Sequence, residues 1–328
     1  MRKLTVIGVI LSSFFIILAF KNFNLNDFTS AMVKVNIFLV FLAAGAFLCS
    51  YILRGIRWQI MLKSVKEIPF LTSFCILFIG YMANALLPLR LGEVIRAYVL
   101  GVKENISKLA SLSSIILERI FDGMILVFFL SMLLIIYPFP GWVKNLGIFT
   151  AVLFCGGISL IFMITRYQIK IINFLCYILH FFSDTVHKKI TPYIEKFVLG
   201  VGMLKNKSQS SFVAVISVFI WLNEALVYYI LLIAFNITSQ TLFFIALFTM
   251  IIINFGIMIP SSPGNIGTYH YFCILALTLF GVSSNTALAY AIVANALMII
   301  CTVISGVICM WHMEFSISFL KDEINKFW

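Results

Sequence analysis

Long apolar stretches constrain the fold of this chain more than any other feature. They run over Leu4–Phe20, Asn36–Leu53, Pro69–Leu87, Leu109–Tyr137, Gly147–Thr165, Ser211–Phe235, Thr241–Ile259 and Asn285–Trp311. A helix needs about 20 mostly apolar residues to cross a bilayer. Charged residues make up 11% of the chain, whereas soluble domains average about 25%. We therefore predict an all-α polytopic membrane protein that forms a single integral membrane domain over residues 1–328.

The distribution of Lys and Arg predicts how the chain is threaded, because cytoplasmic loops of membrane proteins are enriched in positive charge. We consider a topology in which Pro69–Leu87 and Thr241–Phe280 are re-entrant, so that each enters and leaves the membrane on one side. Six stretches then cross fully, and 19 of the 23 Lys and Arg lie inside against 3 outside. If Pro69–Leu87 crossed instead, the four basic residues of 90–108 would lie outside, against the rule. We predict six full spans, two re-entrant segments and both termini in the cytoplasm.

Two parts of the chain share one order of features. Residues 71–137 and 242–311 each run from an apolar stretch through a Pro-Gly break and a short helix into a long span. In the re-entrant topology the two units face opposite ways, which predicts an inverted repeat with a binding site between its halves. The basic stretch 166–209 is expected to be a connector whose helices lie at the membrane interface.

The first break lies at Pro88 and Gly92, directly after an apolar run. Proline removes a backbone donor and glycine adopts backbone angles that other residues avoid, so a helix ends here. Charged residues beside broken backbone in a membrane protein indicate a functional site. The alternative is that Arg90 and Arg96 are interfacial anchors.

The long span Leu109–Tyr137 carries Glu118, Arg119 and Asp122 near its middle. The spacing places all three on one helical face. Each charge costs at least about 2.5 kcal/mol at this depth unless it is paired or hydrated. We interpret the group as the wall of a polar cavity between the two breaks, with Arg119 contacting phosphate. The alternative is a structural ion pair that joins this span to Glu224.

The second break, Pro260–Gly267, is uncharged. Its two prolines and two glycines interrupt the helix, and its backbone donors could bind an anion. His270 follows on the next helix, where it is either a proton carrier or phosphate partner, or a side chain satisfied by an internal hydrogen bond. The full set of candidate substrate-binding residues is Arg90, Glu93, Arg96, Glu118, Arg119, Asp122, Glu224, Pro263, Gly264, Gly267 and His270.

Three motifs together resemble the flippase-like transmembrane region of the lysylphosphatidylglycerol synthase family. They are N-x-L-L-P-x-R-x-G-E-x-x-R at 84–96, L-E-R-I-F-D at 117–122 and I-P-S-S-P-G-N-I-G at 259–267. The resemblance implies a region that moves a lipid across the membrane. Fused family members add a soluble C-terminal domain that makes aminoacylated phosphatidylglycerol. This chain stops at Trp328, so we expect a stand-alone member. Many relatives carry an acidic residue where this chain has His270, and stand-alone members are thought to handle glycosylated or isoprenoid phosphates.

The sequence therefore predicts a lipid translocase of the inner membrane, acting on an anionic or phosphate-bearing lipid. In this reading the arginines contact the head group, while the acidic residues hold the arginines or accept protons. The sequence holds none of the G-x-S-x-G, H-E-x-x-H, P-loop or G-x-G-x-x-G motifs, so we expect no enzyme activity, cofactor, bound metal or nucleic acid. Two alternatives stay open. One is a membrane component of a phosphatidylglycerol lysyltransferase system, and the other is a scaffold for a membrane glycosyltransferase.

Overall fold

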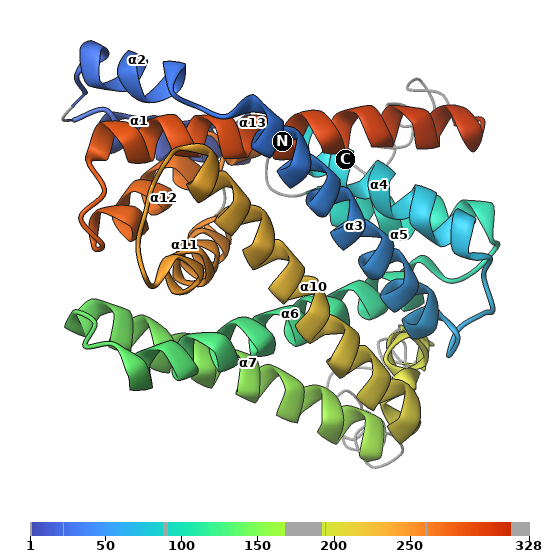
Figure 1. Cartoon of the computed structure of the whole chain (residues 1–328). Coiled ribbons are helices and arrows are strands. Elements are labelled where there is room, and N and C mark those ends of the chain that lie inside the picture. The colour runs from blue at the N-terminus through green and yellow to red at the C-terminus, as the bar shows by residue number, and fades with distance from the viewer. Residues whose placement is uncertain are drawn as a thin grey trace. The chain divides into compact units, whose positions relative to one another are not determined.

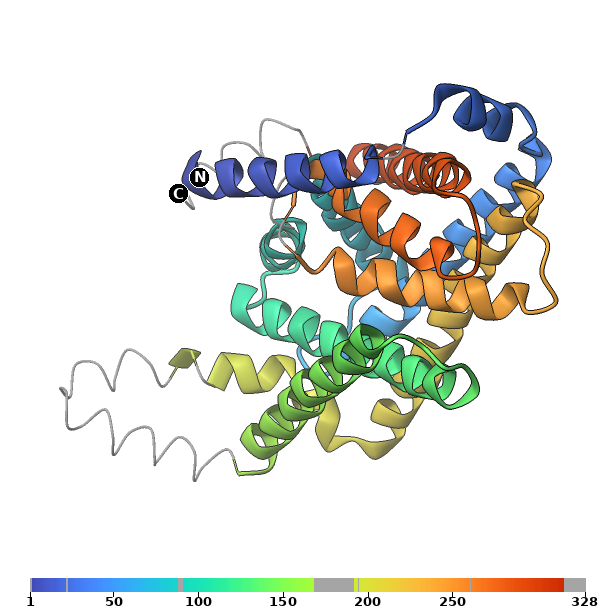
Figure 2. The same ribbon diagram turned by 90° about the vertical axis from the view of Figure 1, so that its left-hand side faces the viewer.

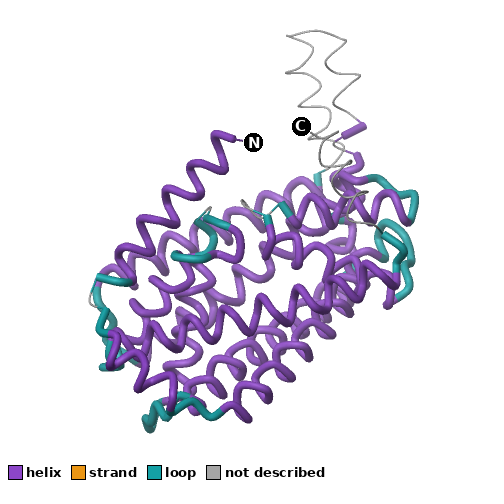
Figure 3. The backbone as a smooth tube through the Cα atoms, turned by 90° about the horizontal axis from the view of Figure 1, so that it is seen from above, coloured by secondary structure: helices purple, strands orange, loops and turns teal. Residues whose placement is uncertain are grey.

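The computed structural model describes residues 2–21, 23–87, 91–167, 192–193, 195–259 and 261–315. Throughout these ranges the regular structure is helical and no strand is present (Figure 3). The helices are α1 (Arg2–Ala19), α2 (Leu25–Val33), α3 (Ile37–Leu62), α4 (Phe70–Leu86), α5 (Gly92–Lys103), α6 (Lys108–Ile136), α7 (Gly141–Arg166), α10 (Lys207–Ala234), α11 (Leu242–Gly256), α12 (Thr268–Thr278) and α13 (Ser284–His312), with short 3-10 turns η2 (Gly202–Lys205) and η3 (Pro263–Asn265).

Five of these helices are long and apolar enough to cross a membrane: α3, α6, α7, α10 and α13. Three shorter apolar helices accompany them, namely residues 10–19 of α1, α4 and α11. The prediction of an all-α polytopic membrane protein is thus confirmed. At 15 residues, α11 falls short of the length that a full crossing needs, and α4, at 17 residues, lies at the lower limit. The re-entrant paths, the inverted repeat and the single domain stay predictions, and most of the connector 166–209 lies outside the described residues.

The sequence-based end of the second span was wrong. We expected the span to stop at Leu53, which would leave Arg57 beyond its end, but α3 continues to Leu62. Arg57 is fully buried inside this helix. A helix tolerates an arginine there because acidic side chains pair with it, which removes most of the cost of burying the charge.

Local sequence explains where several helices begin and end. The Ser107 and Ser283 side chains accept hydrogen bonds from the backbone N–H groups of Ala110 and Thr286, which caps α6 and α13. Helix α6 ends at Ile136, and the backbone of the following Tyr137 is extended (φ −128°, ψ 135°). Pro138 follows directly, and a residue before proline is driven out of the helical region.

The chain divides into two compact units. Unit 1 comprises residues 1–52, 77–95 and 220–328, and unit 2 comprises residues 53–76 and 96–219. In unit 1, α12 packs against α11, α13 and α1, and α13 also contacts α2 (Figures 1 and 2). Tyr228, Phe248 and Tyr290 are buried in this unit.

Unit 2 contains the pair α6 and α7, which lie side by side (Figure 2). Gly123 allows their close approach, since a Cβ at this position would collide with the ring of Phe154. The turn η2 also contacts α7. This packing fixes one side of α6 and so positions the charged residues on that helix.

Candidate functional site

A buried charge cluster in unit 2 is built on α6. Glu118 and Asp122 are 0% and 4% exposed, and the side chain of Arg119 is 28% exposed. Asp122 lies four positions after Glu118 and three positions after Arg119, so it neighbours both side chains on the helix surface. We call Arg57, Arg96, Glu118, Arg119 and Asp122 the charge cluster.

Arg57 of α3 lies between the two carboxylates. Its Nη1 donates to Asp122 Oδ1 at 2.6 Å and to Ser217 Oγ at 2.9 Å. Its Nη2 donates to Glu118 Oε1 at 3.0 Å and to Asp122 Oδ2 at 3.2 Å. The planar guanidinium thus meets Asp122 at two points, a geometry that gives strong, directional ion pairs.

Arg96 of α5 approaches the same cluster from another helix. Its Nη2 donates to Glu118 Oε2 at 2.8 Å. Its guanidinium carbon lies 3.6 Å from the ring centroid of Trp58, in a cation–π contact. The Trp58 Nε1 donates in turn to Ser114 Oγ at 3.2 Å. The side chain of Arg96 is buried, so the alternative that it is an interfacial anchor is wrong.

Arg119 forms the more open edge of the cluster. Its Nη2 lies 3.1 Å from Glu118 Oε1, and its Nη1 lies 3.5 Å from Asp122 Oδ2. In the described part of unit 2, three guanidinium groups therefore meet two carboxylates in this cluster. Three arginines and two carboxylates give the cluster a formal charge of +1. Glu118 forms an ion pair with each of the three arginines.

The sequence analysis placed Arg96, Glu118, Arg119 and Asp122 in one site, and the structure brings these four residues together. It missed Arg57, which donates three hydrogen bonds to the two carboxylates. The signal was present in the sequence. Apolar residues Trp58, Ile60, Met61 and Leu62 continue the span beyond Leu53, and they place Arg57 inside a helix rather than in a loop.

The first break belongs to unit 1. Asn84 Oδ1 accepts a hydrogen bond of 2.8 Å from the backbone N–H of Gly92. A side chain at Gly92 would collide with the carbonyl oxygen of Gly80, so glycine is required for this close return of the chain. Glu93 follows as a half-buried residue in the first turn of α5. Arg90 lies outside the described residues, and its expected role stays a prediction.

The second break also belongs to unit 1. Gly264 and Gly267 have φ values of 67° and 95°, which lie in the region that favours glycine. Asn295 Nδ2 donates to the carbonyl oxygen of Gly264 at 3.1 Å and ties the break to α13. Pro263 begins the short turn η3.

Several backbone donors of this break already have partners. The N–H of Ser262 donates to Ser12 Oγ at 2.7 Å, and that of Gly267 donates to His270 Nδ1 at 3.4 Å. His270 therefore makes an internal hydrogen bond, as the second of the two interpretations expected. The N–H of Asn265 donates to the carbonyl oxygen of Ser262. These three groups are used within the protein, although the anion-binding role of the break stays a prediction.

Glu224 lies in unit 1 on α10 and is 7% exposed. Its Oε2 accepts a hydrogen bond of 3.2 Å from Ser50 Oγ. The neighbouring Asn223 donates from Nδ2 to the carbonyl oxygen of Ala46 at 2.7 Å. Both contacts connect α10 to α3 within this unit.

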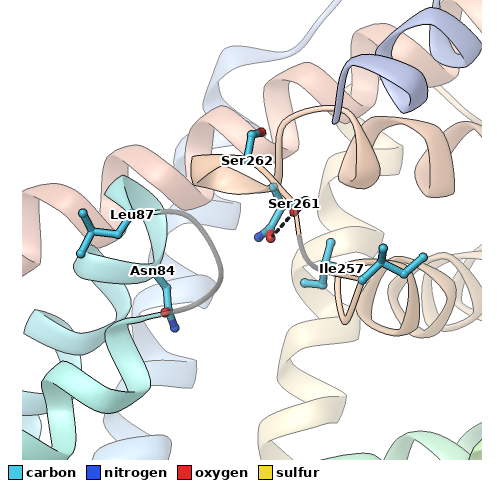
Figure 4. Close-up of a pocket in the computed structure, with 7 residues that line it drawn as sticks. Asn84, Leu87, Ile257, Ser261 and Ser262 are labelled. Atoms are coloured by element: carbon cyan, nitrogen blue, oxygen red, sulfur yellow. Dashed lines mark hydrogen bonds between the residues drawn. The ribbon is translucent and has the colours of Figure 1, made fainter. Parts of the chain in front are cut away.

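A small polar hollow lies between the two breaks, and the charged residues expected in the wall of the predicted cavity are not among its described lining residues. It is lined by Asn84, Leu87, Ile257, Ile259, Ser261, Ser262 and Asn265. Figure 4 shows Asn84 and Leu87 on one side of it and Ile257 and Ser261 on the other. The residues that line it in the described structure are uncharged. We call this hollow the turn pocket.

A comparison with known protein families identifies the chain. The model of the lysylphosphatidylglycerol synthase TM region matches residues 5–306. The chain belongs to this family. It is similar to the UPF0104 membrane protein MJ1595 of Methanocaldococcus jannaschii, at 24% identity over 97% of this chain and 95% of that protein.

The chain is also similar to two other proteins. The UPF0104 membrane protein MJ1078 of the same organism is 26% identical over 74% of this chain and 98% of its own length. The protein named glycosyltransferase AglD of Haloferax volcanii is 23% identical over 98% of this chain, which spans 56% of AglD. No solved structure matches the chain. Among the described residues, no group of three His, Cys, Asp or Glu could hold a metal ion.

Proposed function

We propose that this member of the lysylphosphatidylglycerol synthase TM-region family is a lipid translocase. Its substrate is an anionic or phosphate-bearing lipid, moved across the inner membrane by a protein whose termini are both cytoplasmic. The observation that carries the proposal is the charge cluster, in which three arginines of α3, α5 and α6 meet two carboxylates of α6. Both α3 and α6 are long and apolar enough to cross a membrane. Burying so many charges is costly, and such residues in membrane proteins mark substrate pathways.

The exposure of the cluster supports a specific role for Arg119. Glu118 and Asp122 hold Arg57 and Arg96 deep in the protein, whereas Arg119 remains 28% exposed. A guanidinium is suited to a phosphate head group because its planar donors match phosphate oxygens and it keeps its charge when buried. In this proposal Arg119 contacts the head group, while the two carboxylates orient it. Mass spectrometry of lipids that co-purify with the protein identifies the natural substrate.

The proposal is tested in liposomes that contain the purified protein and a fluorescent phosphatidylglycerol. An impermeant quencher added outside the liposomes bleaches the fluorescent lipid of the outer leaflet. Labelled lipid of the inner leaflet is bleached only after the protein has moved it to the outer leaflet. We expect translocation by the wild type, its loss in Arg119→Ala, and its retention in Arg166→Ala, which removes an exposed arginine at the end of α7. Equal translocation by wild type and Arg119→Ala would remove Arg119 from the site.

A second candidate function rests on the AglD alignment. Nearly the whole chain aligns with about half of a protein that is named a glycosyltransferase, which favours a role as a membrane partner or scaffold for an enzyme of that class. A scaffold would show no translocation in the liposome assay and would tolerate Arg119→Ala. The same experiment therefore separates the two functions.

A further inference from the structure

The turn pocket has features of a cation site, and they do not depend on the charge cluster. Its volume of about 10 Å³ admits roughly one particle of the size of a water molecule. Four of its lining residues carry side-chain oxygens: Asn84, Ser261, Ser262 and Asn265. Oxygen-rich sites of this size suit small, hard cations.

Two helices end at the turn pocket. Leu87 follows the last residue of α4, and Ile257 follows the last residue of α11. At the end of α11 the carbonyl oxygens of Phe255 and Gly256 accept hydrogen bonds from the N–H groups of Met258 and Ile259, so the helix ends act through their dipoles. Each C-terminal end carries about half a negative charge. Two ends together supply about one negative charge, which matches a monovalent cation. Interrupted helices of transporters place their C-terminal ends at Na⁺ sites.

The side chains in the pocket are held in place by the breaks themselves. Ser261 Oγ donates to Asn265 Oδ1 at 3.3 Å, as drawn in Figure 4, and leaves its oxygen lone pairs available. Asn265 has a φ of 56°, a backbone conformation that Asn and Asp adopt more readily than other side chains. Ser262 is tied through its backbone N–H to Ser12. Ser262 Oγ donates to the carbonyl oxygen of Ile266 at 3.0 Å, and Asn84 Oδ1 accepts from the N–H of Gly92 at 2.8 Å. These hydrogen bonds fix the positions of the side-chain oxygens.

We propose that the turn pocket binds a single, partly dehydrated monovalent cation of the size of Na⁺. An anion is disfavoured because the two helix ends at the pocket are negative. A divalent cation is disfavoured because the same residues include no carboxylate. This inference stands on the geometry of unit 1 and does not require that the chain transports lipid.

Binding is measured with radioactive ²²Na⁺ on the purified full-length protein in detergent without added lipid. Thermal melts in NaCl and in choline chloride at equal ionic strength give a second readout. We expect saturable ²²Na⁺ binding and a melting temperature that rises with NaCl, because a ligand of the folded state stabilises it. Ser261→Ala should weaken the apparent affinity about tenfold, since a contact to a charged group is lost.

Two further variants separate cation binding from a loss of fold. Asn265→Asp keeps the size and the backbone preference of the residue but adds a negative charge, so it should bind Na⁺ more tightly than the wild type. Thr249→Val removes a buried hydroxyl of α11 that lies outside the pocket, and it should leave binding unchanged. Absence of saturable ²²Na⁺ binding by the wild type, or equal binding by wild type, Ser261→Ala and Asn265→Asp, would overturn the proposal and assign a water molecule to the pocket. Neither result bears on lipid translocation, which the liposome assay measures separately.

Discussion

Arg57 and Asp122 form a two-point ion pair inside unit 2. The Nη1–Oδ1 and Nη2–Oδ2 distances are 2.6 and 3.2 Å, and Arg57 is 0% exposed. The pair joins α3 to α6 at the position where α6 also carries Arg119. Any movement of α3 against this part of α6 must break charge-assisted bonds, so the pair fixes the geometry in which Arg119 is presented.

The first prediction concerns this geometry. Arg57→Lys keeps the positive charge but replaces a planar fork by a single ammonium group, which cannot meet both oxygens of Asp122 and also Glu118 in the same way. We expect the free energy of unfolding to fall by about 2 kcal/mol, from the loss of bonds to charged partners. Thermal melts in detergent measure the change. Arg166→Lys is the matched control at an exposed arginine, and an equal melting temperature for both variants would contradict the prediction.

The second prediction separates binding from folding at Arg119. Arg119→Lys should retain part of the translocation that Arg119→Ala loses, because ammonium attracts phosphate but is more strongly hydrated and lacks the planar donors. Both variants should melt close to the wild type, since the Arg119 side chain is 28% exposed and exposure weakens ion pairs. Liposome translocation and thermal melts are compared on the same preparations. A large drop in melting temperature for Arg119→Ala would instead assign the residue to a structural ion pair, because a buried partner is then left uncompensated.

The third prediction tests the topology. In a chain whose 7 cysteines are replaced, a new cysteine in Asn145→Cys should react with an impermeant thiol reagent added outside the cell. The matched variant Lys103→Cys should react only after the membrane is opened, because the positive-inside count places residues 90–108 in the cytoplasm. Efficient labelling of Lys103→Cys from outside would disprove the re-entrant path of Pro69–Leu87.

The fourth prediction concerns the first break. Gly92→Ala should destabilise the protein by more than about 1 kcal/mol, because the added Cβ collides with the Gly80 carbonyl oxygen and with Asn84, which overpacks the site. Gly141→Ala is the control, since nothing lies within 4 Å of a Cβ at that position. Thermal melts of the two variants should move in different directions, because alanine is the better helix former at an unhindered position. Equal melting temperatures would show that the chain relaxes around Gly92.

The sequence by itself determined the helices and their interruptions. Apolar stretches long enough to span a bilayer predicted the bounds of α6, α10 and α13 to within a few residues. They predict helices because backbone N–H and C=O groups in lipid must form their hydrogen bonds within the helix. Proline and glycine predicted where α4 and α11 end, since these residues act through the local backbone. Spacing along one helix also placed Glu118, Arg119 and Asp122 on one face.

Only the tertiary structure decided which side chains from different helices meet. Arg57 lay beyond the predicted end of its span. Its acidic partners Glu118 and Asp122 lie 61 and 65 residues away in the chain, so the sequence did not show the pairing. The sequence left open whether Arg96 is a site residue or an interfacial anchor, because it does not show that Trp58 covers Arg96 and that Glu118 pairs with it. The turn pocket likewise requires Asn84 and Ser261 to face each other from segments far apart in the chain. The cost of burying a charge or a polar atom depends on the partners that folding brings to it, and helical periodicity carries no information about partners on another helix.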